Sequence, residues 1–381
     1  MGLARQLRHR AFLFAIAQSA SHMKPIRLLV DSFADADEFN AQMTNARDLV
    51  SRLNPERFHV TMFLCGEPHS SLADRPETRF VQLGQQRQTL RILPEFIFGR
   101  HSILFYVKAS PASKLYMRLR RAWHDRRIVV GSIESQSDLR KDETVKDEQI
   151  RLWEETVLRS DVLFSNSSSV RASLQKNYGL ESEVIPTGVD TRFFAPAWDR
   201  PPNRRPRVLF VGSLRRFKGP QLLVEAAARF GQADFVIIGN GPLESELRAE
   251  IQQRGLTNCE LAGGRYGEEL REQYRRADVF LFPSHWEGSP KVILEAASCG
   301  LPVLARSDYG PETVEHGKTG YLAGNERELL EHLDSLLASA DLRRKLGKAS
   351  RALSERFDWD LITRQWEKVF LREATKLGVQ S

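Results

Sequence analysis

Short apolar runs that alternate with amphipathic stretches limit the fold of this chain more than any other feature of its sequence. Before residue 200 the runs cover residues 26–30, 58–64, 80–83, 102–107, 127–130 and 161–165. A helical pattern at 41–53 follows the first of them. Strands that alternate with helices form parallel sheets with right-handed crossovers. The first half is therefore predicted to be a Rossmann-like domain.

A proline-rich, charged stretch at residues 201–206 interrupts this alternation and is typical of a linker. Further apolar runs then follow at 207–212, 235–239, 258–263, 278–282 and 301–305. The last helical pattern, at 358–377, places Trp359, Ile362, Trp366 and Phe370 at helical spacing. We expect an α/β protein with an N-terminal Rossmann-like domain at 1–200, a second at 201–356, and a C-terminal helix at 357–381.

The composition limits which cellular compartments and which binding partners suit this chain. The formal net charge of +7 permits anionic partners such as phosphorylated ligands or acidic membranes, and no nucleic-acid-binding module is visible. Three widely spaced cysteines have no metal-ligand spacing and favour a reducing, cytoplasmic compartment. The apolar stretch at 11–17 is too short to span a bilayer. We expect it to form a surface-binding amphipathic helix rather than a signal peptide.

The stretch from Asp278 to Gly300 concentrates the signals for a ligand site. A buried strand closed by Pro283 is followed by a helix for which Ser289 is the expected N-cap and Pro290 the first helical residue. Gly300 is expected to end that helix. A helix N-terminus at the carboxyl edge of a parallel sheet favours an anion such as a diphosphate.

Two carboxylates bracket this predicted anion site. Glu287 precedes the helix and Glu295 lies inside it, with seven residues between them. Because carboxylates repel phosphates, the expected partners are hydroxyl groups of a sugar or a ribose. The alternative is that Glu287 is a solvated loop acid and that Glu295 pairs with Lys291 one turn earlier.

A second phosphate-binding arrangement is predicted where the linker ends. The strand at 207–211 ends at Gly212, and the next loop holds Arg216 and Lys218 before a new helix at about 220–230. The glycine lets backbone approach a ligand, and the cations supply charge. Gly239 belongs to a partial dinucleotide fingerprint after the following strand, which is a weak signal.

On these motifs the chain resembles the retaining, nucleotide-sugar-dependent glycosyltransferases of family 4. The resemblance covers the chain from about residue 24 and is strongest at 208–322. It implies the GT-B fold, with two Rossmann-like domains facing each other across a cleft and a C-terminal helix that crosses back to the first. The nucleotide sugar is then held mainly by the second domain and the acceptor by the first.

The resemblance also assigns roles to residues. It places Glu287 at the transferred sugar near its anomeric carbon, Glu295 at the ribose hydroxyls, and Lys218 with Arg216 at the diphosphate. The other donor-binding residues that it implies are Gly212, Ser213, Gly239, Arg265, Tyr266, Gly288, Ser289, Pro290 and Lys291. Retention of anomeric configuration without a metal or other cofactor is implied as well.

The chain departs from the family pattern in three places. The first loop holds Asp31, Asp35, Asp37 and Glu38 instead of glycines, which suggests contacts with acceptor hydroxyls. Glu134 stands where many members have a histidine, and it is either an acceptor-orienting group or an ordinary loop acid. Ser213 stands where an arginine is common, and Arg215 or Arg216 would compensate.

The segment from 109 to 127 is rich in cations and has two interpretations. Leu115, Leu119 and Trp123 fall at i, i+4 and i+8, so one stripe of the predicted helix is apolar with a basic flank. The stripe either lies on an anionic membrane leaflet or faces the protein core.

We therefore predict a glycosyltransferase that moves a sugar from a UDP- or GDP-linked donor to a saccharide or lipid-linked acceptor. Cell-surface polysaccharide or lipopolysaccharide synthesis, at the inner face of a membrane, is the expected setting. A nucleotide-sugar epimerase, a phosphorylase and a catalytically silent binding subunit are the alternatives. A nicotinamide oxidoreductase has only the partial glycine pattern in its favour.

Overall fold

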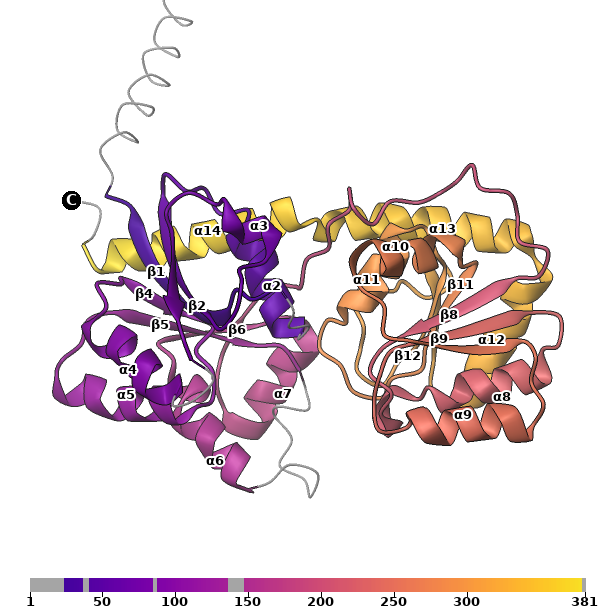
Figure 1. Ribbon diagram of the computed structural model, residues 1–381, viewed down its shortest axis with the longest axis horizontal. Helices are drawn as coiled ribbons and strands as arrows, with labels where there is room; N and C mark the ends of the chain where they lie inside the picture. Colours follow the sequence, from indigo (N-terminus) through magenta and orange to yellow (C-terminus); the bar gives the residue numbers. More distant parts are fainter. Residues whose placement is uncertain (1–23, 37–40, 85–87, 136–146, 379–381) are drawn as a thin grey trace, which may run out of the picture. The chain divides into compact units, whose positions relative to one another are not determined.

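The computed structural model describes residues 24–36, 41–84, 88–135 and 147–378 (Figure 1). The predicted helix at 11–17 and the loop acids Asp37 and Glu38 lie outside these residues. The chain forms two compact units, one made of Met1–Ser132, Asp147–Leu163 and Thr363–Ser381, the other of Ile133–Lys146 and Phe164–Ile362.

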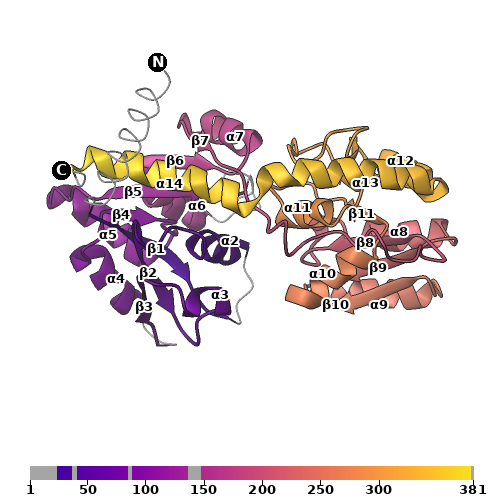
Figure 2. The same cartoon turned by 90° about the horizontal axis from the view of Figure 1, so that it is seen from above.

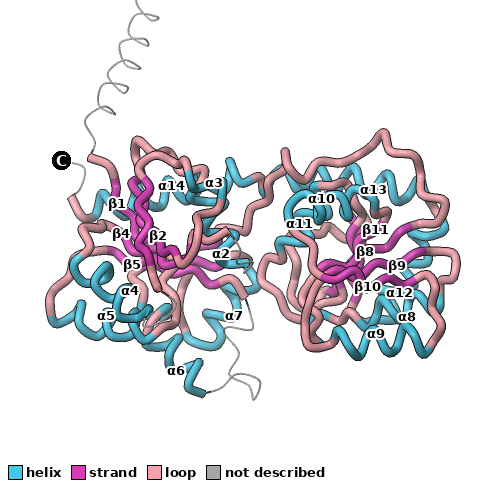
Figure 3. Tube along the Cα trace, in the orientation of Figure 1, coloured by secondary structure: helices cyan, strands magenta, loops and turns pink. Residues whose placement is uncertain are grey.

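A seven-stranded sheet organises the N-terminal part of the chain (Figure 3). Its strands are β1 (Ile26–Phe33), β2 (Phe58–Leu64), β3 (Thr78–Gln82), β4 (Ile103–Phe105), β5 (Ile128–Ile133), β6 (Val162–Ser165) and β7 (Glu183–Val184). They lie in the order β3-β2-β1-β4-β5-β6-β7. Strand β1 pairs in parallel with β2 and β4, and its apolar side chains Ile26, Leu28, Leu29 and Val30 are buried, as in parallel sheets covered by helices on both faces.

Helices and short turns connect these strands. They are α2 (Ala41–Val50), α3 (Ser70–Ala73), α4 (Gln88–Phe98), α5 (Pro111–Ala122), α6 (Asp147–Glu155), η2 (Val157–Arg159) and α7 (Ser168–Tyr178). Helix α5 begins at a capping box formed by Ser110 and Ser113, with Pro111 as its first residue. The ring of Phe96 on α4 packs 5.3 Å from the ring of Tyr116 on α5.

The second sheet has six strands in the order β10-β9-β8-β11-β12-β13. The strands are β8 (Arg207–Val211), β9 (Asp234–Ile238), β10 (Cys259–Gly263), β11 (Val279–Phe282), β12 (Val303–Arg306) and β13 (Gly320–Ala323). The connecting helices are η3 (Arg216–Lys218), α8 (Gln221–Arg229), α9 (Glu244–Gln253), α10 (Gly267–Arg276), α11 (Lys291–Ser298), α12 (Glu326–Ala338), α13 (Ala340–Ser354) and η4 (Glu355–Phe357). The strand order reverses between β8 and β11, which is where open α/β sheets bind ligands.

The last helix, α14 (Trp359–Lys376), confirms the predicted C-terminal helix and its packing on the first domain (Figure 2). Its Trp366 ring lies 4.8 Å from the ring of Phe105 on β4. Its Phe370 ring lies 6.0 Å from the ring of Phe58 on β2. The two aromatic side chains are nearly fully buried, so the helix closes the core of that unit.

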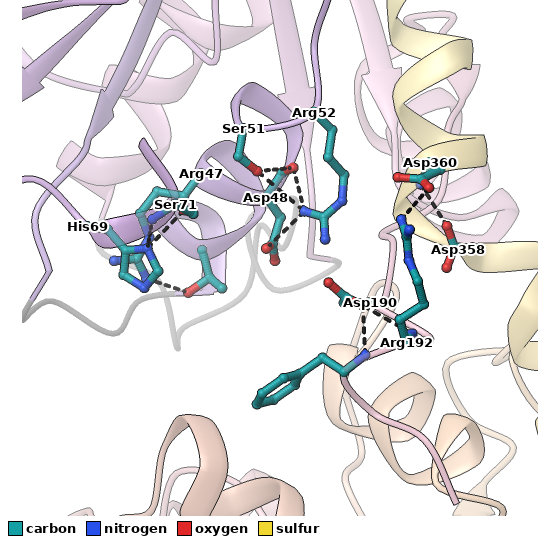
Figure 4. Close-up of polar contacts among 12 residues, drawn as sticks. Arg47, Asp48, Ser51, Arg52, His69, Ser71, Asp190, Arg192, Asp358 and Asp360 are labelled. Atoms are coloured by element: carbon teal, nitrogen blue, oxygen red, sulfur yellow. Dashed lines mark hydrogen bonds and ion pairs between the residues drawn. The ribbon is translucent and has the colours of Figure 1, made fainter. Parts of the chain in front are cut away.

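Polar contacts fix the ends of two helices (Figure 4). At the start of α14, Asp358 accepts a hydrogen bond of 2.8 Å from the backbone N–H of Asp360, and Arg192 pairs with the Asp360 carboxylate at 2.6 Å. After the end of α2, the Arg52 guanidinium donates to the carbonyl oxygen of Asp48 at 2.9 Å.

The structure shows which side chains of the basic helix α5 are buried. On α5 the buried side chains are Tyr116 and Met117, whereas Leu115 is 41% and Trp123 is 54% exposed. Leu115 and Trp123 of the predicted stripe are therefore exposed and Leu119 is half-buried, while the helix packs on the core through other residues, as the core-facing interpretation requires. None of the helices in the described part of the chain combines the length and apolar character needed to cross a bilayer.

Candidate active site

The loops that follow β8 and β11 meet at the point where the strand order reverses. The backbone N–H of His285 donates to the carbonyl oxygen of Phe217 at 2.9 Å, which joins the two loops directly. Gly219 has a φ of +67°, and a Cβ there would lie 3.0 Å from the carbonyl oxygen of Pro283. Only glycine accommodates both conditions, so Gly219 permits the close approach of the loops.

Lys218 and Glu287 form an ion pair where these loops meet. Their side chains are only 18% and 12% exposed, and the Ser284 hydroxyl donates to the same carboxylate oxygen at 2.6 Å. The ammonium group also lies 5.4 Å from the centre of the Phe282 ring. Glu287 is therefore not a solvated loop acid. Ser284 was not identified from the sequence, in which its only signal was its place two residues after the strand.

The N-terminus of α11 differs from the prediction by one residue. The helix begins at Lys291, and the capping position is Pro290 rather than Ser289 because Pro290 has an extended backbone. Ser289 is 8% exposed, and its hydroxyl oxygen has no hydrogen-bond partner among the described residues. A buried hydroxyl without a partner fits a ligand that brings its own oxygen atoms, such as a phosphate.

Glu295 lies on the buried side of α11. It is 6% exposed, and the hydroxyl of the fully buried Tyr274 donates to its carboxylate at 3.0 Å. Burial, and then the neighbouring Glu295, raise the pKa of Tyr274 well above its usual value, so the tyrosine stays a donor at physiological pH. Tyr274 was not identified from the sequence, since it lies in α10 with no motif around it.

The two cations of the η3 turn have different partners. Arg216 is 76% exposed on its side chain and pairs with Glu246 of α9 at 3.1 Å. Ser213, at the position where the family commonly has an arginine, is exposed. Lys218 is thus the cation that the structure brings to Glu287, while Arg216 lies on the side of α9.

The predicted glycine and base-binding residues lie at the carboxyl ends of β8, β9 and β10. A Cβ on Gly239 would fall 1.9 Å from the carbonyl oxygen of Gly212, so these glycines let the ends of β8 and β9 pack together. Asn240 then accepts a hydrogen bond of 2.9 Å from the backbone of Gly264. Arg265 and Tyr266 follow directly, and Tyr266 is 47% exposed. Gly288 lies in the loop between Glu287 and α11.

The predicted acceptor residues lie near the carboxyl ends of β1 and β5. Asp31 is 6% exposed and accepts a hydrogen bond of 2.8 Å from the backbone N–H of Lys108. Glu134 follows β5, and its carbonyl oxygen accepts a hydrogen bond of 2.7 Å from the Asn166 side chain. Asp35 accepts a hydrogen bond of 2.9 Å from the backbone N–H of Cys65, so its carboxylate links the first loop to the residue after β2.

Among the described residues no cluster of three or more potential ligands could hold a metal ion.

Burial raises the pKa of Asp31 to about 6, despite its hydrogen bond from Lys108. The folded protein therefore binds this proton more tightly than the unfolded chain, and stability falls as the pH rises from about 4 to about 6. We expect Asp31→Asn to be more stable than the parent by up to about 3 kcal/mol near pH 8, and to lose this advantage near pH 4. Urea denaturation of both proteins at both pH values measures this difference in the free energy of unfolding.

The exposed Asp74 provides the control, since Asp74→Asn should leave the pH dependence of unfolding as it is in the parent. An Asp31→Asn protein with the parent's pH dependence would contradict the assignment of that dependence to Asp31.

The two parallel sheets have the architecture of a GT-B protein. A sucrose-phosphate synthase from Thermosynechococcus elongatus has a similar structure, with a TM-score of 0.74 and 21% sequence identity. The match covers 92% of this chain and 99% of that one. The HepE protein of Anabaena, solved in complex with UDP-glucose, matches with a TM-score of 0.72 and 18% identity, over 92% of this chain and all of that one.

Residues 196–353 match the family described as glycosyl transferases group 1. Over these residues the chain is similar to that family. A D-inositol 3-phosphate glycosyltransferase of Corynebacterium jeikeium is 30% identical over 252 residues, and the alignment covers 58% of this chain and 60% of that protein. The alignment thus spans less than two thirds of this curated relative.

Proposed function

We propose that this protein transfers a sugar from a nucleotide sugar to an acceptor hydroxyl with retention of anomeric configuration. The observation that supports this most is the largely buried ion pair of Lys218 and Glu287, at the strand-order reversal and next to the N-terminus of α11. A cation and a helix N-terminus suit a diphosphate, and the adjacent carboxylate suits the hydroxyls of the attached sugar.

In this proposal each group acts on a defined part of the donor. Lys218 and the first N–H groups of α11 bind the diphosphate and stabilise its charge as the sugar leaves. The buried Ser289 hydroxyl donates to a phosphate oxygen. Glu287 contacts the sugar near its anomeric carbon, and Glu295, oriented by Tyr274, contacts the ribose hydroxyls. The remaining predicted donor contacts are Gly212, Ser213, Arg216, Gly239, Arg265, Tyr266, Gly288, Pro290 and Lys291.

We further propose a donor, an acceptor and a cellular setting for the reaction. A UDP-linked donor is supported by the likeness to HepE, which was solved with UDP-glucose. A saccharide or lipid-linked acceptor at Asp31 and Glu134 would fit the N-terminal domain, proposed as residues 1–200, with the donor domain at 201–356. The expected setting is glycolipid or cell-surface polysaccharide synthesis at the cytoplasmic face of a membrane.

A thermal-shift screen against UDP-, GDP- and ADP-sugars, with NAD as the control, tests the donor class. One nucleotide sugar should stabilise the protein by about 3 kcal/mol when present at 100 times its dissociation constant. Glu295→Gln, which keeps a hydrogen-bond acceptor for Tyr274, should lose most of that stabilisation. If no nucleotide sugar raises the melting temperature, the donor-site assignment is wrong.

A catalytically silent nucleotide-sugar-binding subunit is the second candidate. It is favoured by Ser213 and Glu134, which stand where the resembled family commonly has an arginine and a histidine. Release of free nucleotide from the bound donor separates the two, because a silent subunit binds the donor without consuming it. Release of free nucleotide rather than an epimerised sugar also separates a transferase from an epimerase.

A further inference from the structure

Helices α4 and α5 each expose apolar side chains at helical spacing. On α4, Leu90 is 64% and Phe98 is 80% exposed. On α5, Leu115 is 41% and Trp123, at the C-terminal cap, is 54% exposed. Large apolar side chains grouped on the surface of a domain mark an interaction site.

We call the outer surface of these two helices the α4–α5 face. The two helices pack side by side, with Phe96 of α4 against Tyr116 of α5 (Figure 1). Arg127 joins their C-terminal ends, because it donates to the carbonyl oxygen of Gly99 at 3.2 Å and pairs with Asp125. Both helices flank β4 and run antiparallel to it, so Phe98 and Trp123 lie toward the amino ends of the strands.

A cationic cavity of about 210 Å³ lies at the C-terminal end of α5, and His124, the residue after Trp123, is part of its lining. Its lining residues are Met117, Arg120, Arg121, His124, Asp125, Arg159 and Asp161. Arg120 is neutralised by Asp161 at 2.8 Å, and Asp125 is paired with Arg127 outside the lining. Arg121 and Arg159 are exposed, and neither forms an ion pair with any residue that the structure describes. The cavity therefore offers two uncompensated guanidinium groups to an anion.

We propose that the α4–α5 face docks on an anionic phospholipid membrane. Phe98 and Trp123 enter the headgroup layer, and Arg121 and Arg159 bind lipid phosphates at the cavity. Charge complementarity favours this occupant. Exposed aromatic rings suit the boundary between headgroups and acyl chains, and unpaired arginines suit the anionic headgroups. Docking here leaves the carboxyl ends of β1 and β5 uncovered. The proposal names a partner of the proposed transferase but does not depend on its chemistry.

Co-sedimentation of the full chain with vesicles tests the proposal. We expect binding to vesicles that contain phosphatidylglycerol, weak binding to pure phosphatidylcholine, and release in 1 M salt, where the Debye length is about 3 Å. Arg121→Gln with Arg159→Gln should weaken the partition onto anionic vesicles about tenfold. Phe98→Ser with Trp123→Ser should weaken it by about tenfold or more, even at low salt.

A matched control removes the same charge elsewhere. Arg344→Gln with Lys348→Gln changes two exposed cations of α13 and should leave the partition unchanged. Equal vesicle binding by all variants, or no binding to anionic vesicles at low salt, would overturn the proposal. So would stabilisation by soluble glycerol phosphate that needs Arg121 and Arg159 while vesicles do not bind, because the cavity would then hold a free phosphate compound. Nucleotide-sugar binding by the same variants should equal that of the parent, so failure of membrane docking can be distinguished from failure of the proposed function.

Discussion

Glu287→Gln is expected to lower the rate of sugar transfer, and of donor hydrolysis without acceptor, by about a thousandfold. Glutamine has the same shape and can still accept the hydrogen bond from Ser284. It has no negative charge to stabilise positive charge on the sugar as the diphosphate leaves. The measurement is the release of free nucleotide from a donor sugar, at saturating donor, for the parent and the variant.

Two comparisons make this result specific to Glu287. Glu331→Gln replaces an exposed glutamate of α12 and should leave the rate at the parent value. Thermal shift by the donor should be retained in Glu287→Gln, because the cations and α11 still bind the diphosphate. Unchanged turnover in the variant would remove Glu287 from the reaction, and donor binding without turnover in the parent would favour the silent subunit.

Lys218→Met is expected to lower the stability of the second unit by about 2 kcal/mol and to weaken donor binding at least tenfold. Removal of the ammonium group leaves the Glu287 carboxylate, 12% exposed, without its charged partner. Breaking a fully buried ion pair costs about 3–5 kcal/mol, and the exposure of both side chains justifies a smaller figure. Urea denaturation gives the change in the free energy of unfolding.

The double variant Lys218→Met with Glu287→Leu separates the charge effect from packing. It removes both charges, so it should be more stable than Lys218→Met alone. If the double variant is less stable than the single one by the full cost of Glu287→Leu, the two residues are not coupled, and the ion pair is not what holds Glu287 in place. Lys318→Met, which affects an exposed pair with Glu315, is the matched control and should change stability little.

Much of the fold could be predicted from the sequence because it depends on local pattern. The run at residues 58–64 is apolar at every buried position except Thr61, and the structure forms β2 over these same residues. The final helix was predicted within one residue of its observed bounds, since Trp366 and Phe370 recur at helical spacing on its buried face. The candidate site was located by residue type at strand ends, where parallel sheets bind ligands.

Tertiary structure alone decided which partners these residues have. Lys218 and Glu287 are 69 positions apart, and Tyr274 reaches Glu295 from another helix, so no local pattern could pair them. The backbone of Pro290, rather than residue preference, placed the helix start one residue later than expected. Helical spacing showed that Leu115 and Trp123 share a stripe of α5, but only packing of Tyr116 and Met117 into the core turned that stripe outward. Periodicity determines which side chains lie together, and the rest of the fold determines which side is buried.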